Sequence, residues 1–177
     1  MNKIIAVIGM PGSGKTEAVK FFVENKYARV YFGEVVMNEI ETLGISVNEA
    51  NERTVRENLR KELGMGAMAI KSLDKINRLF ENSNVVIESL YSWEEYKIIK
   101  QKYDKSFKLL CIFTSKDLRY KRLGDRPFRP LSRIQAESRD YAEIENLDKG
   151  GPIALADYTV INDGTIDELK KNLKNYL

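Results

Sequence analysis

Residues 9–16 read Gly9-Met10-Pro11-Gly12-Ser13-Gly14-Lys15-Thr16, which matches the phosphate-binding pattern G-x-x-x-x-G-K-[ST]. The apolar run Lys3–Ile8 before it predicts a buried strand, and the segment from 15 to about 25 predicts a helix. Glycines let such a loop curl its N–H groups around an anion, and the helix N-terminus adds partial positive charge. We expect all eight residues to bind a nucleoside triphosphate, with Lys15 on the β- and γ-phosphates and Thr16 on Mg²⁺.

The composition is that of one soluble domain. The 177 residues are 43% hydrophobic and 31% charged, with a net charge of only +3. No apolar run approaches the ~20 residues that span a bilayer, so we expect a cytoplasmic location and no membrane partner. The single cysteine, Cys111, lies in an apolar run, where it is expected to pack in the core.

The chain contains no histidine. This excludes Ser-His-Asp catalysis, Cys-His dyads and nearly every common zinc site. Proton transfer must therefore fall to a carboxylate, a lysine or the substrate itself. Phosphoryl transfer is compatible with this, because positioning and charge neutralisation do most of its catalysis.

Five apolar runs alternate with helical patterns along the chain. The runs predict strands at Lys3–Ile8, Ala28–Phe32, Asn84–Glu88, Lys108–Thr114 and Tyr158–Asn162. Helices are expected near 15–25, 34–42, 50–62, 67–81, 92–103, 116–123, 132–147 and 165–176. The pattern indicates a single α/β domain over 1–177, with a parallel sheet covered on both faces. In such folds ligands bind beyond the carboxyl ends of the strands.

Three features after the second strand are candidates for an acceptor site. Glu34 opens a helix, where it either favours the helix N-terminus or borders the site. Arg56 and Arg60 share a helical face with Arg53 beside an apolar stripe, so they either line a cleft or form a solvated face. Gly66 permits a close backbone approach or a plain turn between helices.

The third and fifth strands each end in polar residues. Glu88 ends the third strand, where a carboxylate beside a phosphate loop can hold Mg²⁺ or organise the nucleophile; capping the next helix is the alternative. Asn162 and Gly164 follow the fifth strand, in a turn whose position also suits contact with the nucleotide base.

Six arginines fall within 21 positions, among prolines that stiffen the segment. Guanidinium groups bind phosphate oxygens bidentately and offset transition-state charge. We interpret residues 122–139 as a lid. Arg119 is assigned to nucleotide binding, Arg139 to the acceptor, and three arginines to catalysis: Arg122, Arg126 and Arg129. A basic surface loop or an RNA contact is the alternative.

These motifs together resemble the largely archaeal, adenylate-kinase-related family of P-loop kinases. This family is nucleoside-monophosphate-kinase-like and is also similar to dephospho-CoA kinase. The matching stretches are Gly9–Thr16, Gly33-Glu34-Val35-Val36, Gly64-Met65-Gly66-Ala67 and Ile153–Tyr158 running on to Asn162–Thr165. The resemblance implies the strand order 2-3-1-4-5, an acceptor insertion at about 33–81, the short lid at 122–139, and ATP with Mg²⁺ as cofactors.

One position departs from the family pattern. Adenylate kinases carry an Asp-Gly-x-x-Arg-like element after the third strand, whereas this chain reads Glu88-Ser89-Leu90-Tyr91. Tyr91 therefore stands where an arginine would clamp the acceptor phosphate, although Arg56 or Arg60 can substitute for it.

The sequence therefore predicts an ATP-dependent kinase whose acceptor is AMP or a similar nucleotide or phosphate-bearing molecule. Two alternatives remain open: a regulatory NTPase with slow hydrolysis, and an RNA-acting kinase or ATPase.

Overall fold

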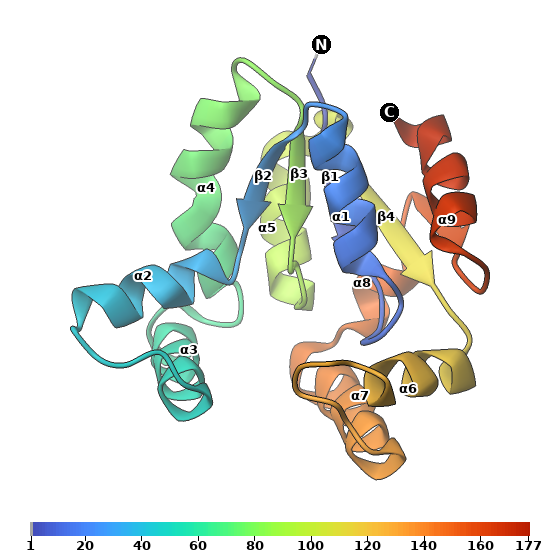
Figure 1. Cartoon of the computed structure of the whole chain (residues 1–177). Helices are drawn as coiled ribbons and strands as arrows, with labels where there is room; N and C mark the ends of the chain where they lie inside the picture. The colour runs from blue at the N-terminus through green and yellow to red at the C-terminus, as the bar shows by residue number, and fades with distance from the viewer. Residues whose placement is uncertain (1) are drawn as a thin grey trace.

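The computed structural model describes residues 2–177 and contains one five-stranded parallel sheet (Figure 1). Its strands are β1 (Ile4–Ile8), β2 (Ala28–Tyr31), β3 (Val85–Glu88), β4 (Phe107–Phe113) and β5 (Tyr158–Ile161). They are ordered β2-β3-β1-β4-β5, which confirms the predicted order and the α/β class. The central strand β1 pairs on both sides, with Ala6 opposite Ile87 and Leu109.

Helices connect successive strands and cover both faces of the sheet. They are α1 (Lys15–Glu24), α2 (Glu34–Thr42), α3 (Glu49–Leu63), α4 (Ala67–Phe80), α5 (Trp93–Tyr103), α6 (Lys116–Gly124), α7 (Arg133–Leu147), α8 (Gly150–Ala154) and α9 (Ile166–Leu173). Short 3₁₀ turns occupy 104–106 and 174–176. The five-residue α8 is absent from the sequence prediction, because Gly150, Gly151 and Pro152 are typical turn residues.

Alternation along the strands divides the core into two layers. Ala6, Ile87 and Leu109 face α3, α4 and α5, whereas Val7 and Leu110 face α1 and α9. In Figure 1, α1 crosses in front of the sheet and α5 lies behind it. Cys111 is 2% exposed within the first of these layers, as its apolar surroundings predict.

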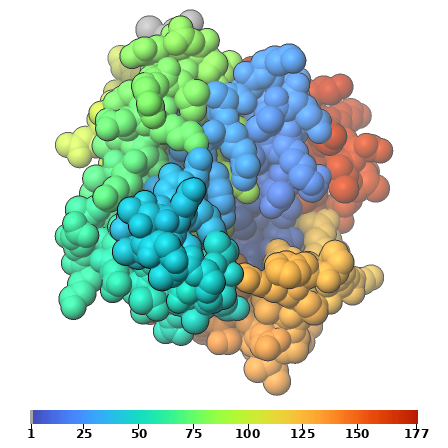
Figure 2. Space-filling model, turned by 60° about the vertical axis from the view of Figure 1, so that its left-hand side comes forward, coloured from blue at the N-terminus to red at the C-terminus, as the bar shows by residue number. Residues whose placement is uncertain are grey.

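The region above the carboxyl ends of the strands is flanked by two helical groups. One contains α2 and α3 from the predicted acceptor insertion, and the other contains α6 and α7, which are joined through the lid. Both groups extend from the same end of the molecule in Figure 1, and their cyan and orange surfaces share one end in Figure 2. Among residues 2–177, no helix has both the length and the apolarity needed to cross a bilayer.

The α1 side of the core provides a stability test. Phe22 is fully buried and packs edge-on against Tyr27, with 5.1 Å between the two ring centres, while its neighbour Val23 is 41% exposed. We expect Phe22→Ala to lower the free energy of unfolding by about 3–5 kcal/mol, because it leaves a cavity. Val23→Ala is the control and should change it by less than about 0.5 kcal/mol. Urea denaturation measures both, and equal losses would contradict this description of the core.

Candidate active site

The phosphate loop, residues 9–16, connects β1 to α1 in a conformation that requires glycine. Gly12 has a φ of 80°, and a Cβ atom there would lie 2.7 Å from the Arg119 carbonyl oxygen. Gly14 precedes α1 with a φ of 98°, and no side chain caps the helix. The N-terminal amides of α1 are therefore open to an anion.

The ends of β4 and β5 hold the loop from below. Asn162 Nδ2 donates to the Ser13 carbonyl oxygen at 2.8 Å. The Thr114 hydroxyl lies 3.1 Å from the same oxygen and 2.9 Å from the Asn162 carbonyl oxygen. Asn162 is only 6% exposed, so its side chain supports the loop backbone from within the protein. Any contact of Asn162 with the nucleotide stays a prediction.

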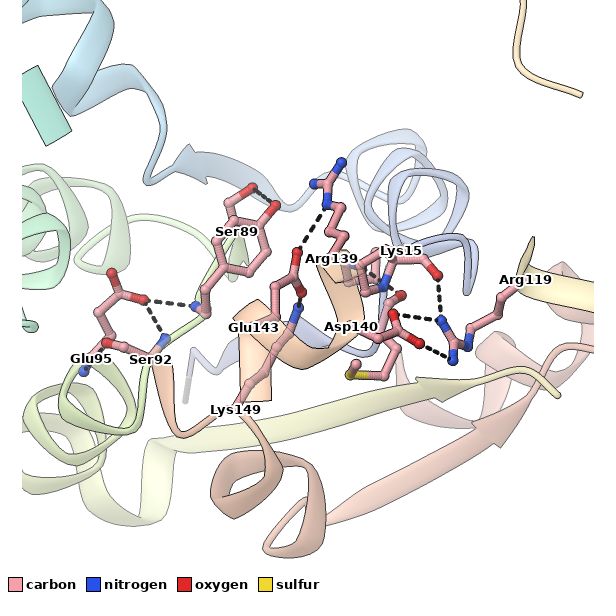
Figure 3. A network of polar contacts seen from close by, with 12 residues as sticks. Lys15, Ser89, Ser92, Glu95, Arg119, Arg139, Asp140, Glu143 and Lys149 are labelled. Atoms are coloured by element: carbon pink, nitrogen blue, oxygen red, sulfur yellow. Dashed lines mark hydrogen bonds and ion pairs between the residues drawn. The ribbon is translucent and has the colours of Figure 1, made fainter. Parts of the chain in front are cut away.

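Arg119 ties the loop to the helices on either side of the lid. Its guanidinium group donates to the Pro11 carbonyl oxygen at 3.0 Å and to both carboxylate oxygens of Asp140, at 3.0 and 2.7 Å. The Tyr120 hydroxyl adds a bond to Asp140 at 3.1 Å. Arg119 and Asp140 are both buried, so this pair fixes α6 against α7 (Figure 3). Any contact of Arg119 with the nucleotide also stays a prediction.

A cavity of about 330 Å³ opens above the loop. Its walls come from the phosphate loop, the first turn of α1, the segment after β3, the lid and α7. The lining residues are Pro11, Gly12, Gly14, Lys15, Thr16, Glu17, Tyr91, Arg122, Arg126, Arg139 and Glu143. The structure therefore brings the predicted phosphate-loop residues together with three of the predicted arginines. The volume of the cavity lies within the range of about 300–1,000 Å³ typical of ligand pockets.

Arg122 also makes contacts beyond the cavity wall, whereas Arg129 lies away from it. Arg122 Nη1 lies 3.3 Å from Thr114 Oγ1, and its Nη2 donates to the Gly164 carbonyl oxygen at 3.4 Å. Gly164 thus contacts the lid arginine through its backbone. Arg129 is exposed and stacks on Phe128, with 5.2 Å from the guanidinium carbon to the ring centre. Arg129 does not line the cavity in this conformation.

Lys15 points toward the cavity and donates to the Met10 carbonyl oxygen at 3.0 Å. The pKa of Lys15 is lowered to about 7, chiefly by burial and next by the nearby positive charge of Lys149, although the negative charge of Glu143 opposes both effects. A bound phosphate supplies the negative charge that favours the protonated lysine.

The sequence analysis missed Glu143 and Lys149, which form an ion pair beside the cavity (Figure 3). Lys149 is fully buried, and its ammonium group lies 4.5 Å from the centre of the Tyr91 ring. Arg139 Nε donates to Glu143 Oε1 at 3.2 Å. The spacing of Arg139 and Glu143, four residues apart on a helix, was a usable signal. Lys149 gave none, because it follows a helix end at Asp148 and only the tertiary fold turns it inward.

The predicted acceptor residues lie on the other helical group. Glu34 pairs with Lys75 of α4, and Gly66 packs against Ile98 of α5. Arg56 and Arg60 are half-buried on α3. None of these four predicted residues lines the cavity. Of the predicted acceptor residues, the structure brings only Tyr91 and Arg139 to the phosphate loop.

The half-buried Arg60 lies within electrostatic range of the buried Glu95, whose carboxylate contacts the backbone of Tyr91. Burial lowers the pKa of Arg60, and within residues 2–177 its Nε atom has no hydrogen-bond partner. Glu95 accepts hydrogen bonds from the backbone N–H groups of Tyr91 at 2.7 Å and Ser92 at 3.0 Å. Burial nevertheless raises the pKa of Glu95. This carboxylate fixes the backbone that presents Tyr91.

Glu88 ends β3 as predicted, and its carboxylate bonds to Arg29 of β2. The Arg29 Nε and Nη2 atoms lie 2.6 and 2.5 Å from Glu88 Oε2. Among residues 2–177, no three His, Cys, Asp or Glu side chains converge as a metal cage. A Mg²⁺ ion here therefore needs oxygens from substrate phosphates, which is the usual arrangement for this ion. Thr16 lines the cavity, and its hydroxyl fits that donor set.

Comparison with known proteins identifies relatives over the whole chain. A family model described as an AAA domain matches residues 5–145. The UPF0200 protein of Thermococcus gammatolerans is 33% identical over 175 residues, covering 97% of this chain and 92% of the relative. A UPF0200 protein of Methanosarcina mazei is 28% identical over 179 residues, covering 100% and 95%.

Solved structures share the fold at low sequence identity. TT1252 from Thermus thermophilus has a TM-score of 0.70 at 18% identity, covering 99% of this chain and 96% of that one. Shikimate kinase from Bacteroides thetaiotaomicron scores 0.62 at 15% identity, covering 98% and 97%. A gluconokinase from Sinorhizobium meliloti scores 0.57 at 13% identity, covering 97% and 89%. The glycine-rich loop, the strand order and the full-length matches together show that this chain belongs to the UPF0200 family of AAA-domain, P-loop kinase-like proteins.

Proposed function

We propose that this protein is an ATP-dependent phosphotransferase that moves the γ-phosphoryl group to a small nucleotide or phosphate-bearing acceptor. The observation that carries the proposal is the single cavity joining the phosphate loop to three arginines, Arg122, Arg126 and Arg139. A hydrolase needs only the loop and a water. A transferase also needs a space beside the γ-phosphate that is walled from solvent, which the lid and Tyr91 supply.

Each part of the cavity has a role in this reaction. The loop amides and Lys15 neutralise the β- and γ-phosphates, while the Thr16 hydroxyl serves the Mg²⁺ ion. Glu88 lies outside the cavity wall, so its role at the Mg²⁺ ion requires release from Arg29. Arg122 and Arg126 offset the charge on the transferring group. An arginine in this role is worth about 10³–10⁵ in rate, or about 4–7 kcal/mol of barrier. Arg129 joins them when the lid folds over the loop.

The kinases among the structural neighbours support transfer over hydrolysis alone. The decisive experiment is a phosphoryl-transfer assay with ATP against nucleoside monophosphates, dephospho-CoA and short RNA. We expect one small acceptor to raise ATP consumption well above the rate in water. Slow hydrolysis with every acceptor would favour a regulatory NTPase. Turnover with RNA alone would favour an RNA-acting enzyme, whose affinity falls steeply with salt.

Lys15→Ala tests the nucleotide site. We expect at least a tenfold loss of ATP affinity by isothermal titration calorimetry, together with loss of turnover, because the lysine contacts two phosphates in the proposed complex. Lys20→Ala is the matched control on the same helix, since Lys20 is exposed and pairs with Glu17 at 2.8 Å. Normal binding by Lys15→Ala would remove the basis of the proposal.

Arg126→Ala tests the lid. Arg126 lines the cavity, and burial lowers the pKa of its guanidinium group. We expect its removal to lower kcat by about 10²-fold or more and to change KM less, because its contact strengthens in the transition state. Arg133→Ala serves as the control, since Arg133 pairs with the exposed Asp117 at 2.8 Å. A change confined to KM would assign Arg126 to binding.

A further inference from the structure

Glu143 places a carboxylate in the cavity where the proposed reaction needs cations. Its carboxylate lies between Arg139 and Lys149 in Figure 3, and the residue lines the same space as the phosphate loop. Glu17, the other carboxylate in the wall, is bonded to Lys20 on the outer surface of α1 at 2.8 Å. Glu143 is therefore the acid that is held on the inner side of the cavity, among positive groups.

The surroundings of Glu143 hold it ionised and oriented. Charged groups face it from every neighbouring element: Lys149 beside α8, Arg139 one turn earlier on α7, and Lys15 of the phosphate loop. Burial alone raises the pKa of this carboxyl group, but these cations outweigh burial, so the net shift is downward. At neutral pH the cavity contains a fixed negative charge beside the phosphate loop.

A negative charge in that place discriminates between acceptors. A phosphate oxygen brought next to the carboxylate has no proton to donate to it. A hydroxyl group meets a hydrogen-bond acceptor. The wall opposite the loop is consistent with this, because it presents the ring of Tyr91, whose hydroxyl accepts a bond from Ser89 Oγ at 3.1 Å.

Glu88, the acid expected from the sequence, is less suited to proton transfer. Its carboxylate accepts a hydrogen bond from Arg29 Nε at 2.6 Å, and it does not line the cavity, so it has no access to an acceptor bound there. Glu143 lines the cavity in the company of Lys15, which approaches the transferring phosphoryl group in the proposed complex.

We propose that the acceptor reacts through a hydroxyl group and that Glu143 is the general base; this rests on the phosphotransferase function proposed above. The hydroxyl oxygen forms a bond to the γ-phosphorus while its proton passes to the Glu143 carboxylate. The bond from the γ-phosphorus to the β–γ bridging oxygen breaks, and its electron pair leaves with ADP. Arg139 and Lys149 hold the carboxylate in place, and the proton returns to solvent with product release.

The first experiment uses water as the simplest hydroxyl acceptor. Phosphate release from ATP is measured for the wild type, Glu143→Gln and Glu143→Asp, with Glu145→Gln as the control on the exposed side of α7. We expect Glu143→Gln to slow release by about 10²-fold, within the usual contribution of a general base, while ATP affinity changes less than about threefold. Aspartate should recover part of the rate. The residual rate of Glu143→Gln should rise with pH, because hydroxide then removes the proton.

The outcomes separate this inference from the proposed function. A wild type that neither binds ATP nor releases phosphate overturns the function itself. If the wild type turns over and Glu143→Gln keeps its rate within about twofold, only the inference fails. A loss that is equal at every pH assigns Glu143 to positioning Arg139 and Lys149 and also overturns the inference. Should the glutamine variant not fold, Glu143→Asp withdraws the carboxylate by one methylene group, and a rate within about twofold of the wild type then overturns the inference.

The second experiment compares adenosine, which offers only hydroxyl groups, with AMP, which also offers a phosphate. Phosphorus NMR distinguishes a new phosphate ester from a new phosphoanhydride. Ester formation that depends on Glu143 supports the inference. Conversion of AMP to ADP that is undiminished in Glu143→Gln overturns it. If neither compound exceeds the rate with water, the hydrolysis comparison decides.

Discussion

The hydrogen bond from Asn162 Nδ2 to the Ser13 carbonyl oxygen joins β5 to the phosphate loop, and the geometry of the active site depends on it and its neighbours. A loop that offers its N–H groups to an anion must direct its carbonyl oxygens elsewhere, and buried carbonyls need donors. Asn162, Thr114 and Arg119 supply those donors from below. The order of the sheet makes this possible, because β4 pairs with β1 and β5 pairs with β4, so that both strands end on the same side of the loop.

The same constraint explains why Arg119 is buried beneath the loop, in contact with both the loop backbone and Asp140. The Arg119 guanidinium group donates one hydrogen bond to the Pro11 carbonyl oxygen and two to the Asp140 carboxylate, which neutralises its charge. Removing one partner of such a buried pair costs about 3–5 kcal/mol, since the other charge stays buried and unpaired. The pair therefore couples loop geometry to the relative position of α6 and α7, the two helices that carry the lid.

Much of the fold could be predicted from local patterns, and the site only in part. The apolar strand runs and the glycine-rich loop are short-range features, and the structure confirms them. The strand order, which the family resemblance implied, is confirmed as well. Local patterns do not predict the position of Lys149. It lies between a helix end and two glycines, where the sequence predicts a solvated turn. Lys149 is buried because it packs against Tyr91, which is distant in sequence, and pairs with Glu143, which lies across the end of α7.

The lid region consists of two fixed helices, α6 and α7, and the connection between them at 125–132. Because Arg119 and Asp140 fix α6 against α7, the backbone free to adjust to a ligand is the connection at 125–132, where Arg129 adopts a positive φ of 51°. Phe128 in that connection is 72% exposed, so little apolar burial opposes its movement. Arg139 and Glu143 stand on the fixed helix, whereas Arg126 and Arg129 stand on the adjustable segment. In the proposed reaction, Arg139 and Glu143 would thus be preorganised for the acceptor, whereas Arg126 and Arg129 would move toward the transferring phosphoryl group when the nucleotide binds.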